Sequence, residues 1–188
     1  MKNEITGMRL RLIVMNFLQF AVWGAYLTSM GTYLFNIGLG AKIGLFYAMQ
    51  GIVSLFMPAI MGIIADRWVP AQKLYGFCHF MAAVFMVAAG WYGYVDGEAV
   101  NFGTLFTFYS LSVAFYMPTL ALTNSVAYTA LDKVKLDPVI AFPPIRIFGT
   151  IGFICSMLLT DILGFQNNYM QFFSCAWSDT GGLCAYFA

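Results

Sequence analysis

The stretch LIVMNFLQFAVWGAYLTSMGTYLF, residues 12–35, decides the fold class. It contains 24 consecutive residues without a charged side chain, and a helix needs about 20 mostly apolar residues to cross a bilayer. Lys2, Arg9 and Arg11 precede it, as in a secretory signal. However, the apolar segment of a signal peptide has only about 7–15 residues, and no small-residue cleavage site follows this stretch. The stretch therefore predicts a first membrane span that is retained in the mature protein.

The composition extends this interpretation to the whole chain. Hydrophobic residues make up 61% of the 188 residues and charged residues 9%, with a mean hydropathy of +0.79. An ordinary soluble domain has about a quarter of its residues charged. The net charge of +1 does not indicate a nucleic-acid partner. The four cysteines are scattered and there is a single histidine, so neither a metal site nor a disulfide framework is expected.

Uncharged stretches long enough to span a membrane recur along the chain, separated by short polar links, which predicts an all-α integral membrane protein. The five expected spans are residues 12–35, 43–65, 74–95, 102–129 and 144–164. A sixth would fall at 169–188, but Ser178-Asp179-Thr180-Gly181-Gly182 interrupts it with a charge and two glycines. We therefore expect a defective or partial sixth span, an amino-terminal bundle over residues 1–171, and an aberrant tail over 172–188 left by truncation or a frameshift.

The distribution of lysine and arginine predicts the orientation of the spans. If the amino terminus is cytoplasmic, eight of the nine basic residues lie on or near the inner side, and only Lys42 lies outside. The expected topology is thus multi-pass with a cytoplasmic amino terminus.

The fifth span carries the most informative polar residues. Only about 21 Å of helix separates Arg146 from Asp161, which is less than the roughly 30 Å of hydrocarbon. Arg146, Thr150 and Phe153 are spaced i, i+4, i+7 and share one helical face. A guanidinium, a hydroxyl and an aromatic ring in line could bind a polar, ring-shaped solute. Alternatively, Arg146 extends to the inner interface and Phe153 packs against a neighbour.

Other polar groups within the spans leave two interpretations open. Gln19 and Trp23 share a face of the first span, and Asn124 lies in the fourth. They either line a pore or form hydrogen bonds between helices, which explains the majority of such amides. His79, early in the third span, is either a proton relay or a hydrogen-bonded interfacial histidine.

The link between the second and third spans combines a small residue with charges. Gly62 permits close approach of a helix, and Asp66, Arg67 and Lys73 can pair with each other or with helix ends. The segment is either a conformational latch or a charged turn. It resembles the G-x-x-x-D-R-x-x-x-[RK] loop signature of the major facilitator superfamily, with Lys73 later than the common spacing and Val69-Pro70 in place of small residues.

A closer resemblance, from about Arg11 to Gln171, is to the bacterial nucleoside:proton symporter family. The motifs that carry it are FLQF (17–20) with WG (23–24), FMPA (56–59), YMPTL (116–120), FPPIRI (142–147) and GTIGFI (149–154). In that family the arginine, threonine and phenylalanine of the last two motifs contact the nucleoside. The resemblance thus implies that Arg146, Thr150 and Phe153 bind substrate.

The resemblance implies nucleoside transport by proton-coupled symport, through alternating access, in the inner membrane of a bacterium. It implies no enzymatic activity and no cofactor, the proton being the coupling ion. Family members have twelve helices, and the carboxy-terminal bundle that completes the pocket is absent here, so we expect this chain alone to be an inactive fragment. A superfamily transporter of another small polar solute, such as a sugar, and a half-size carrier acting as a dimer are the alternatives.

Overall fold

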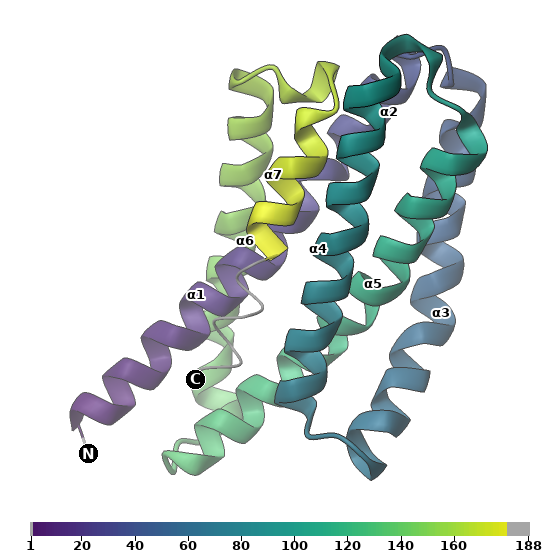
Figure 1. Ribbon diagram of the computed structural model, residues 1–188. Coiled ribbons are helices and arrows are strands. Elements are labelled where there is room, and N and C mark those ends of the chain that lie inside the picture. The colour runs from purple at the N-terminus through teal and green to yellow at the C-terminus, as the bar shows by residue number, and fades with distance from the viewer. Residues whose placement is uncertain (1, 180–188) are drawn as a thin grey trace.

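The computed structural model describes residues 2–179, which form a helical bundle with no strands in that range (Figure 1). The α-helices are α1 (Lys2–Tyr26), α2 (Ser29–Asn36), α3 (Ile43–Arg67), α4 (Ala71–Asp96), α5 (Phe102–Lys133), α6 (Pro138–Ile162) and α7 (Met170–Asp179). Short 3-10 turns occur at Gly40–Lys42, Gly97–Ala99 and Phe165–Asn167.

Within the described residues, five helical segments are long and apolar enough to cross a membrane, which confirms the all-α membrane fold class. These are Glu4–Asn36, Gly40–Arg67, Ala71–Asp96, Phe102–Lys133 and Pro138–Ile162. The first combines α1 and α2, which are separated only by a turn at Leu27 and Thr28. α1, α4 and α6 begin three to ten residues before the expected spans and α5 ends four residues after its span, whereas α6 ends two residues early.

The start of α6 differs most from expectation. We expected the span to begin near Pro144, but the helix begins at Pro138. Asp137 caps it by accepting a hydrogen bond from the backbone nitrogen of Val139 at 2.9 Å, and proline suits the first helical position, where its missing N–H would have no partner. Pro143 and Pro144 therefore lie inside the helix.

The sixth segment is a short helix rather than a full span in the described range. We expected the helix to be interrupted from Ser178 onward, but it includes Ser178 and Asp179. The rest of the expected interruption, from Thr180, lies outside the described residues. Phe172 and Cys175 are completely buried. The part of the expected tail that is described thus packs as an integral element of the bundle.

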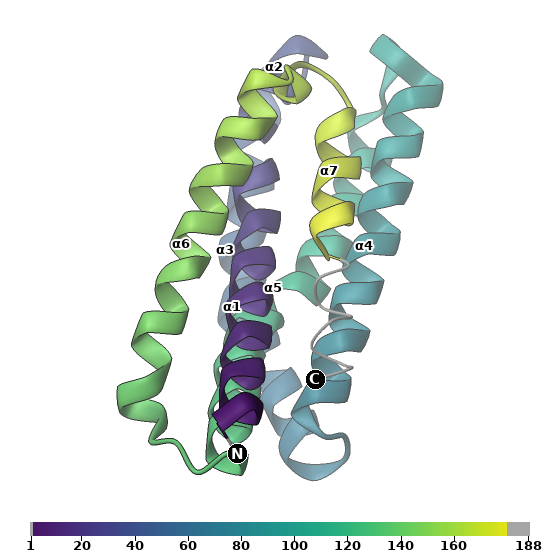
Figure 2. The same ribbon diagram turned by 90° about the vertical axis from the view of Figure 1, so that its left-hand side faces the viewer.

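The helices are arranged so that α1 packs along α6, α5 lies between α3 and α4, and α7 fills the space between α1 and α4 (Figures 1 and 2). The start of α1 and the α3–α4 and α5–α6 links lie at one end of the bundle. The α2–α3, α4–α5 and α6–α7 links lie at the other. α3 and α6 expose rows of large apolar side chains, such as Leu55 and Ile162, that require lipid or another membrane-embedded surface.

The crossing of α1 and α6 is unusually close because it is made by glycines. A Cβ atom at Gly152 would overlap the backbone carbonyl oxygen of Phe17, and one at Gly24 would overlap that of Phe153. Small residues allow helix backbones to approach in this way within membranes, where packing drives association. The two helices are thus held in a single register.

Replacing Gly152 by leucine should separate α1 from α6 and destabilise the bundle by about 2 kcal/mol, because a side chain cannot fit against the Phe17 carbonyl. Unfolding of the detergent-solubilised chain by sodium dodecyl sulfate, followed by circular dichroism, would measure this. Gly44→Leu is the matched control, since a Cβ at Gly44 would meet nothing within 4 Å. Equal unfolding of both variants would contradict the close crossing.

Candidate functional site

The three residues singled out on the fifth span lie on α6, where Arg146 and the backbone of Phe153 contact α1. The Cζ atom of Arg146 lies 3.8 Å from the ring centroid of Phe20 on α1, a cation–π contact. Arg146 and Phe153 are half-buried and Thr150 is exposed. α6 is helical throughout this segment, so the guanidinium of Arg146 and the hydroxyl of Thr150 lie one turn apart along it.

Gly149 shapes the environment of the guanidinium. A Cβ atom at this position would lie 2.8 Å from Nη1 of Arg146 and 2.6 Å from the Phe20 ring. A glycine is thus needed for the guanidinium to fold back over the aromatic ring. The contact holds Arg146 beside α1 instead of letting it extend along the lipid-facing side of α6.

The aromatic surface continues from Phe20 to Trp23, whose ring centroids are 6.2 Å apart. Trp23 lines a pocket of about 340 Å³ between α1, α3 and α5, together with Gln50 and Ser54. The indole Nε1 of Trp23 and Oε1 of Gln50 are both buried without a hydrogen-bond partner in the described part of the chain. Buried polar atoms are normally paired, so these two are unmatched polar atoms in side chains that line the pocket.

Sequence reasoning missed Phe20 and Gln50. Phe20 was visible only as part of a family motif, because nothing in the sequence predicts that it stacks under an arginine 126 positions later. Gln50 is an amide within an apolar span, the same signal that drew attention to Gln19. That signal was available and was not used.

The other polar residues singled out within the spans separate into two environments. Gln19 is 1% exposed and lies inside the bundle, where Tyr75, His79, Thr119 and Thr123 surround its amide. These contacts match the interhelical alternative. Asn124 is exposed on α5, and Trp23 is linked to Arg146 through Phe20.

The residues of the expected latch lie at the α3–α4 link. Asp66, Arg67 and Lys73 are exposed, and no ion pair joins them within the described range. A Cβ atom at Gly62 would meet nothing within 4 Å, so the close helix contact expected there does not occur in the described residues. The charges and the small residue remain accessible to another surface.

The described residues contain no group of three or more histidine, cysteine, aspartate or glutamate side chains that could hold a metal ion. The polar groups at the α1–α6 junction are donors and acceptors of hydrogen bonds.

Comparisons with known proteins agree with the family resemblance. Residues 6–186 match the family model described as "Nucleoside H+ symporter". The match extends past Gln171, where we expected the resemblance to fade, and includes α7. The homologues are permeases and not enzymes.

Two relatives from Escherichia coli (strain K12) are similar over most of the chain. The xanthosine permease is 40% identical over 166 residues, which cover 87% of this chain and 38% of the permease. The nucleoside permease NupG is 38% identical over 170 residues, which cover 89% of this chain and 39% of the permease. The chain thus spans about two-fifths of the length of these relatives.

The crystal structure of the nucleoside transporter NupG superposes with a TM-score of 0.84 at 38% identity. The superposition covers 95% of this chain and 43% of that transporter. The fold is therefore that of the amino-terminal bundle of a major facilitator transporter. With a family model matched over nearly its whole length, this multi-pass membrane chain belongs to the nucleoside H+ symporter family.

Proposed function

We propose that this chain forms the amino-terminal half of a proton-coupled nucleoside carrier and supplies one wall of its solute site. The observation that carries the proposal is the guanidinium of Arg146 held over Phe20, on the same face of α6 as Thr150 and Phe153. The family match and the two permease relatives support nucleosides as the solute.

Each group at this wall has a role that its chemistry permits. Arg146 donates hydrogen bonds to carbonyl oxygens of the base or hydroxyl oxygens of the ribose. The hydroxyl of Thr150 forms a further hydrogen bond that orients the solute. Phe153 stacks on the planar base. Gln50 and Trp23 offer an acceptor and a donor to the sugar. Unpaired polar atoms of this kind favour a polar solute over an apolar one.

We further propose that the amino terminus is cytoplasmic and that the protein resides in the inner membrane of a bacterium. The end of the bundle where α1 starts also carries the basic residues of the α3–α4 and α5–α6 links, among them Arg67, Lys73 and Lys133. This asymmetry supports the orientation. Asp66, Arg67 and Lys73, with Gly62, would then act as a latch against the opposite half on the cytoplasmic side.

A carboxy-terminal bundle is required for transport in this proposal. Alternating access needs two bundles that rock about a central site, and the relatives are more than twice as long as the matched segment. The exposed apolar faces of α3 and α6 are consistent with contact to further protein or lipid.

The chain alone should not take up nucleosides, whereas its fusion to the carboxy-terminal half of NupG should. Labelled uridine uptake would be measured in an Escherichia coli strain that lacks its nucleoside permeases, with and without a protonophore. Uptake by the fusion that the protonophore abolishes is the expected result. Proton-dependent uptake by the unfused chain would contradict the need for a second bundle.

Replacing Arg146 by alanine in this fusion should lower kcat/KM for uridine by about 10- to 100-fold, because charge-assisted hydrogen bonds to the solute are lost. Arg9→Ala is the matched control, since it removes an exposed arginine at the start of α1. Unchanged uptake by the Arg146→Ala variant at normal expression would show that Arg146 is not part of the solute site.

The orientation can be tested with single cysteines introduced at Lys42 and Lys73, after the four native cysteines are replaced by serine. A membrane-impermeant maleimide added to intact spheroplasts should label Lys42→Cys and leave Lys73→Cys unlabelled until the membrane is opened. The reverse pattern would place the amino terminus outside.

A further inference from the structure

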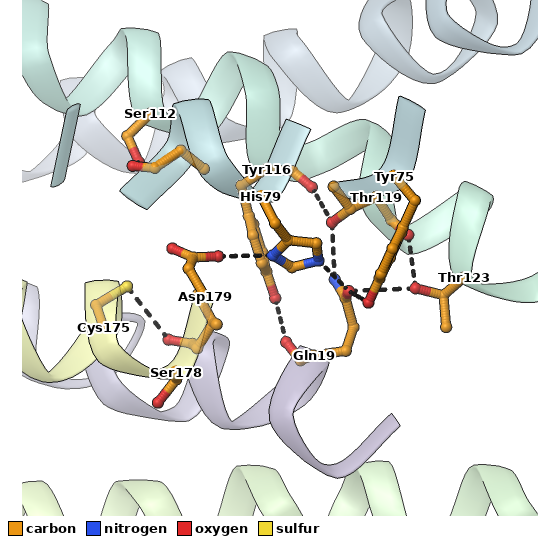
Figure 3. A network of polar contacts seen from close by, with 12 residues as sticks. Gln19, Tyr75, His79, Ser112, Tyr116, Thr119, Thr123, Cys175, Ser178 and Asp179 are labelled. Atoms are coloured by element: carbon orange, nitrogen blue, oxygen red, sulfur yellow. Dashed lines mark hydrogen bonds and ion pairs between the residues drawn. The ribbon is translucent and has the colours of Figure 1, made fainter. Parts of the chain in front are cut away.

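The single histidine of the chain, His79, lies inside the bundle between groups from two other helices (Figure 3). Its Nδ1 lies 2.8 Å from Oδ1 of Asp179 on α7, and its Nε2 lies 2.7 Å from Oε1 of Gln19 on α1. His79 and Asp179 are each only 1% exposed. The imidazole on α4 thus bridges α1 and α7 in the interior.

The hydrogen-bond network determines which end of the Gln19 amide faces the imidazole. The hydroxyl of Thr119 donates its proton to the carbonyl oxygen of Tyr116 at 2.6 Å, so its oxygen accepts from Nε2 of Gln19 at 2.8 Å. The carbonyl end of Gln19 therefore faces the other way, where it accepts a hydrogen bond from the hydroxyl of Tyr75 at 2.7 Å. The same oxygen faces Nε2 of His79.

Both ring nitrogens of His79 thus face acceptors, a carboxylate oxygen and an amide oxygen. A neutral imidazole has only one N–H. If the carboxylate of Asp179 is also ionised, one of the two contacts has no proton. One additional proton satisfies both, either on the imidazole or on the carboxyl group, which then donates to Nδ1.

We propose that the His79–Asp179 pair is a proton-binding site and that the geometry observed is its proton-loaded form. Loss of the proton removes one of two contacts, that between α4 and α7 at Asp179 or that between α4 and α1 at Gln19. The protonation state therefore controls whether α4 is held by hydrogen bonds to both α1 and α7 or to only one of them. That this proton is the coupling ion of transport rests on the proposed function.

The other ionisable groups around the pair are uncharged at neutral pH. Tyr75 and Tyr116 place their rings against the imidazole, with centroids 4.6 and 6.0 Å away, and Tyr26 and Cys175 are the further ionisable side chains near Asp179. Within the described residues, Asp179 forms an ion pair with His79. Its second oxygen, Oδ2, has no hydrogen-bond partner in the described range. The pair must therefore balance its charge internally, since isolated buried charges are strongly disfavoured.

Because His79 is the only histidine, its ring nitrogens can be observed without assignment in a ¹⁵N-histidine-labelled chain that carries a tag free of histidine. The chain would be studied in nanodiscs by nitrogen NMR from about pH 5 to about pH 8, the range in which histidine pairs exchange protons. The wild-type ring shifts should change in one step. In Asp179→Asn the amide donates to Nδ1 and leaves a satisfied neutral ring, so the change should be about tenfold smaller.

Two further variants make the outcome decisive. Asp179→Glu keeps the carboxylate and should restore the pH-dependent change. Ser29→Ala removes the contact of Ser29 Oγ with Gln171 Oε1 at 2.7 Å, a polar link of α7 to the first membrane span that does not involve His79, and should titrate as the wild type does. Equal titration in Asp179→Asn and wild type, or a wild-type ring whose shifts do not change with pH, would overturn the proton site.

The role in transport is measured separately in the fusion to the carboxy-terminal half of NupG. Asp179→Asn should abolish uridine accumulation driven by a proton gradient while exchange of internal for external uridine continues. Equal loss of both would show that the pair is structural and not coupled to the proton. A pair that titrates in a fusion without any uridine uptake would contradict the proposed function and leave the proton site standing.

Discussion

Two glycines, Gly24 on α1 and Gly152 on α6, bring helix backbones into contact, and the positions of the functional groups follow from that crossing. Because each glycine faces a carbonyl of the other helix, the register of α6 along α1 cannot slip by a turn without a collision. That register brings Arg146 over Phe20. A guanidinium within a membrane-spanning helix would otherwise have to reach the interface; here an aromatic face on a neighbouring helix stabilises it at depth.

The bundle has two kinds of polar surface with opposite consequences. In the interior, His79 links Gln19 and Asp179 through short hydrogen bonds from three helices. Around Trp23 and Gln50, polar atoms are buried and unmatched. Polar groups that have hydrogen-bond partners stabilise the fold itself. Buried polar groups without a partner lower the free energy only when another molecule supplies that partner. In the proposed function, the unmatched groups around Trp23 and Gln50 are the ones that would contact the solute.

The fold could be predicted almost entirely from the sequence, because membrane spans are determined by the length and composition of uncharged stretches. The grouping of Arg146, Thr150 and Phe153 was also predictable, since it depends only on helical periodicity within one element. The partners Phe20 and Asp179 were not, because they depend on how distant helices pack. Asp179 even seemed out of place by sequence, a charge in a weak helix; its partner His79 lies 100 positions earlier.

The turn at Leu27 and Thr28, between α1 and α2, has a mechanical consequence. The carbonyl oxygen of Leu27 accepts a hydrogen bond from the hydroxyl of Tyr47 on α3 at 2.6 Å. The turn is thereby tied to the start of the next span, while α1 is tied to α6 through glycines. α2 itself is held on the other side of the bundle, since Ser29 Oγ donates a hydrogen bond to Gln171 Oε1 on α7 at 2.7 Å. The first span thus consists of two helices held by separate contacts, and Trp23 lies one helical turn before the break between them.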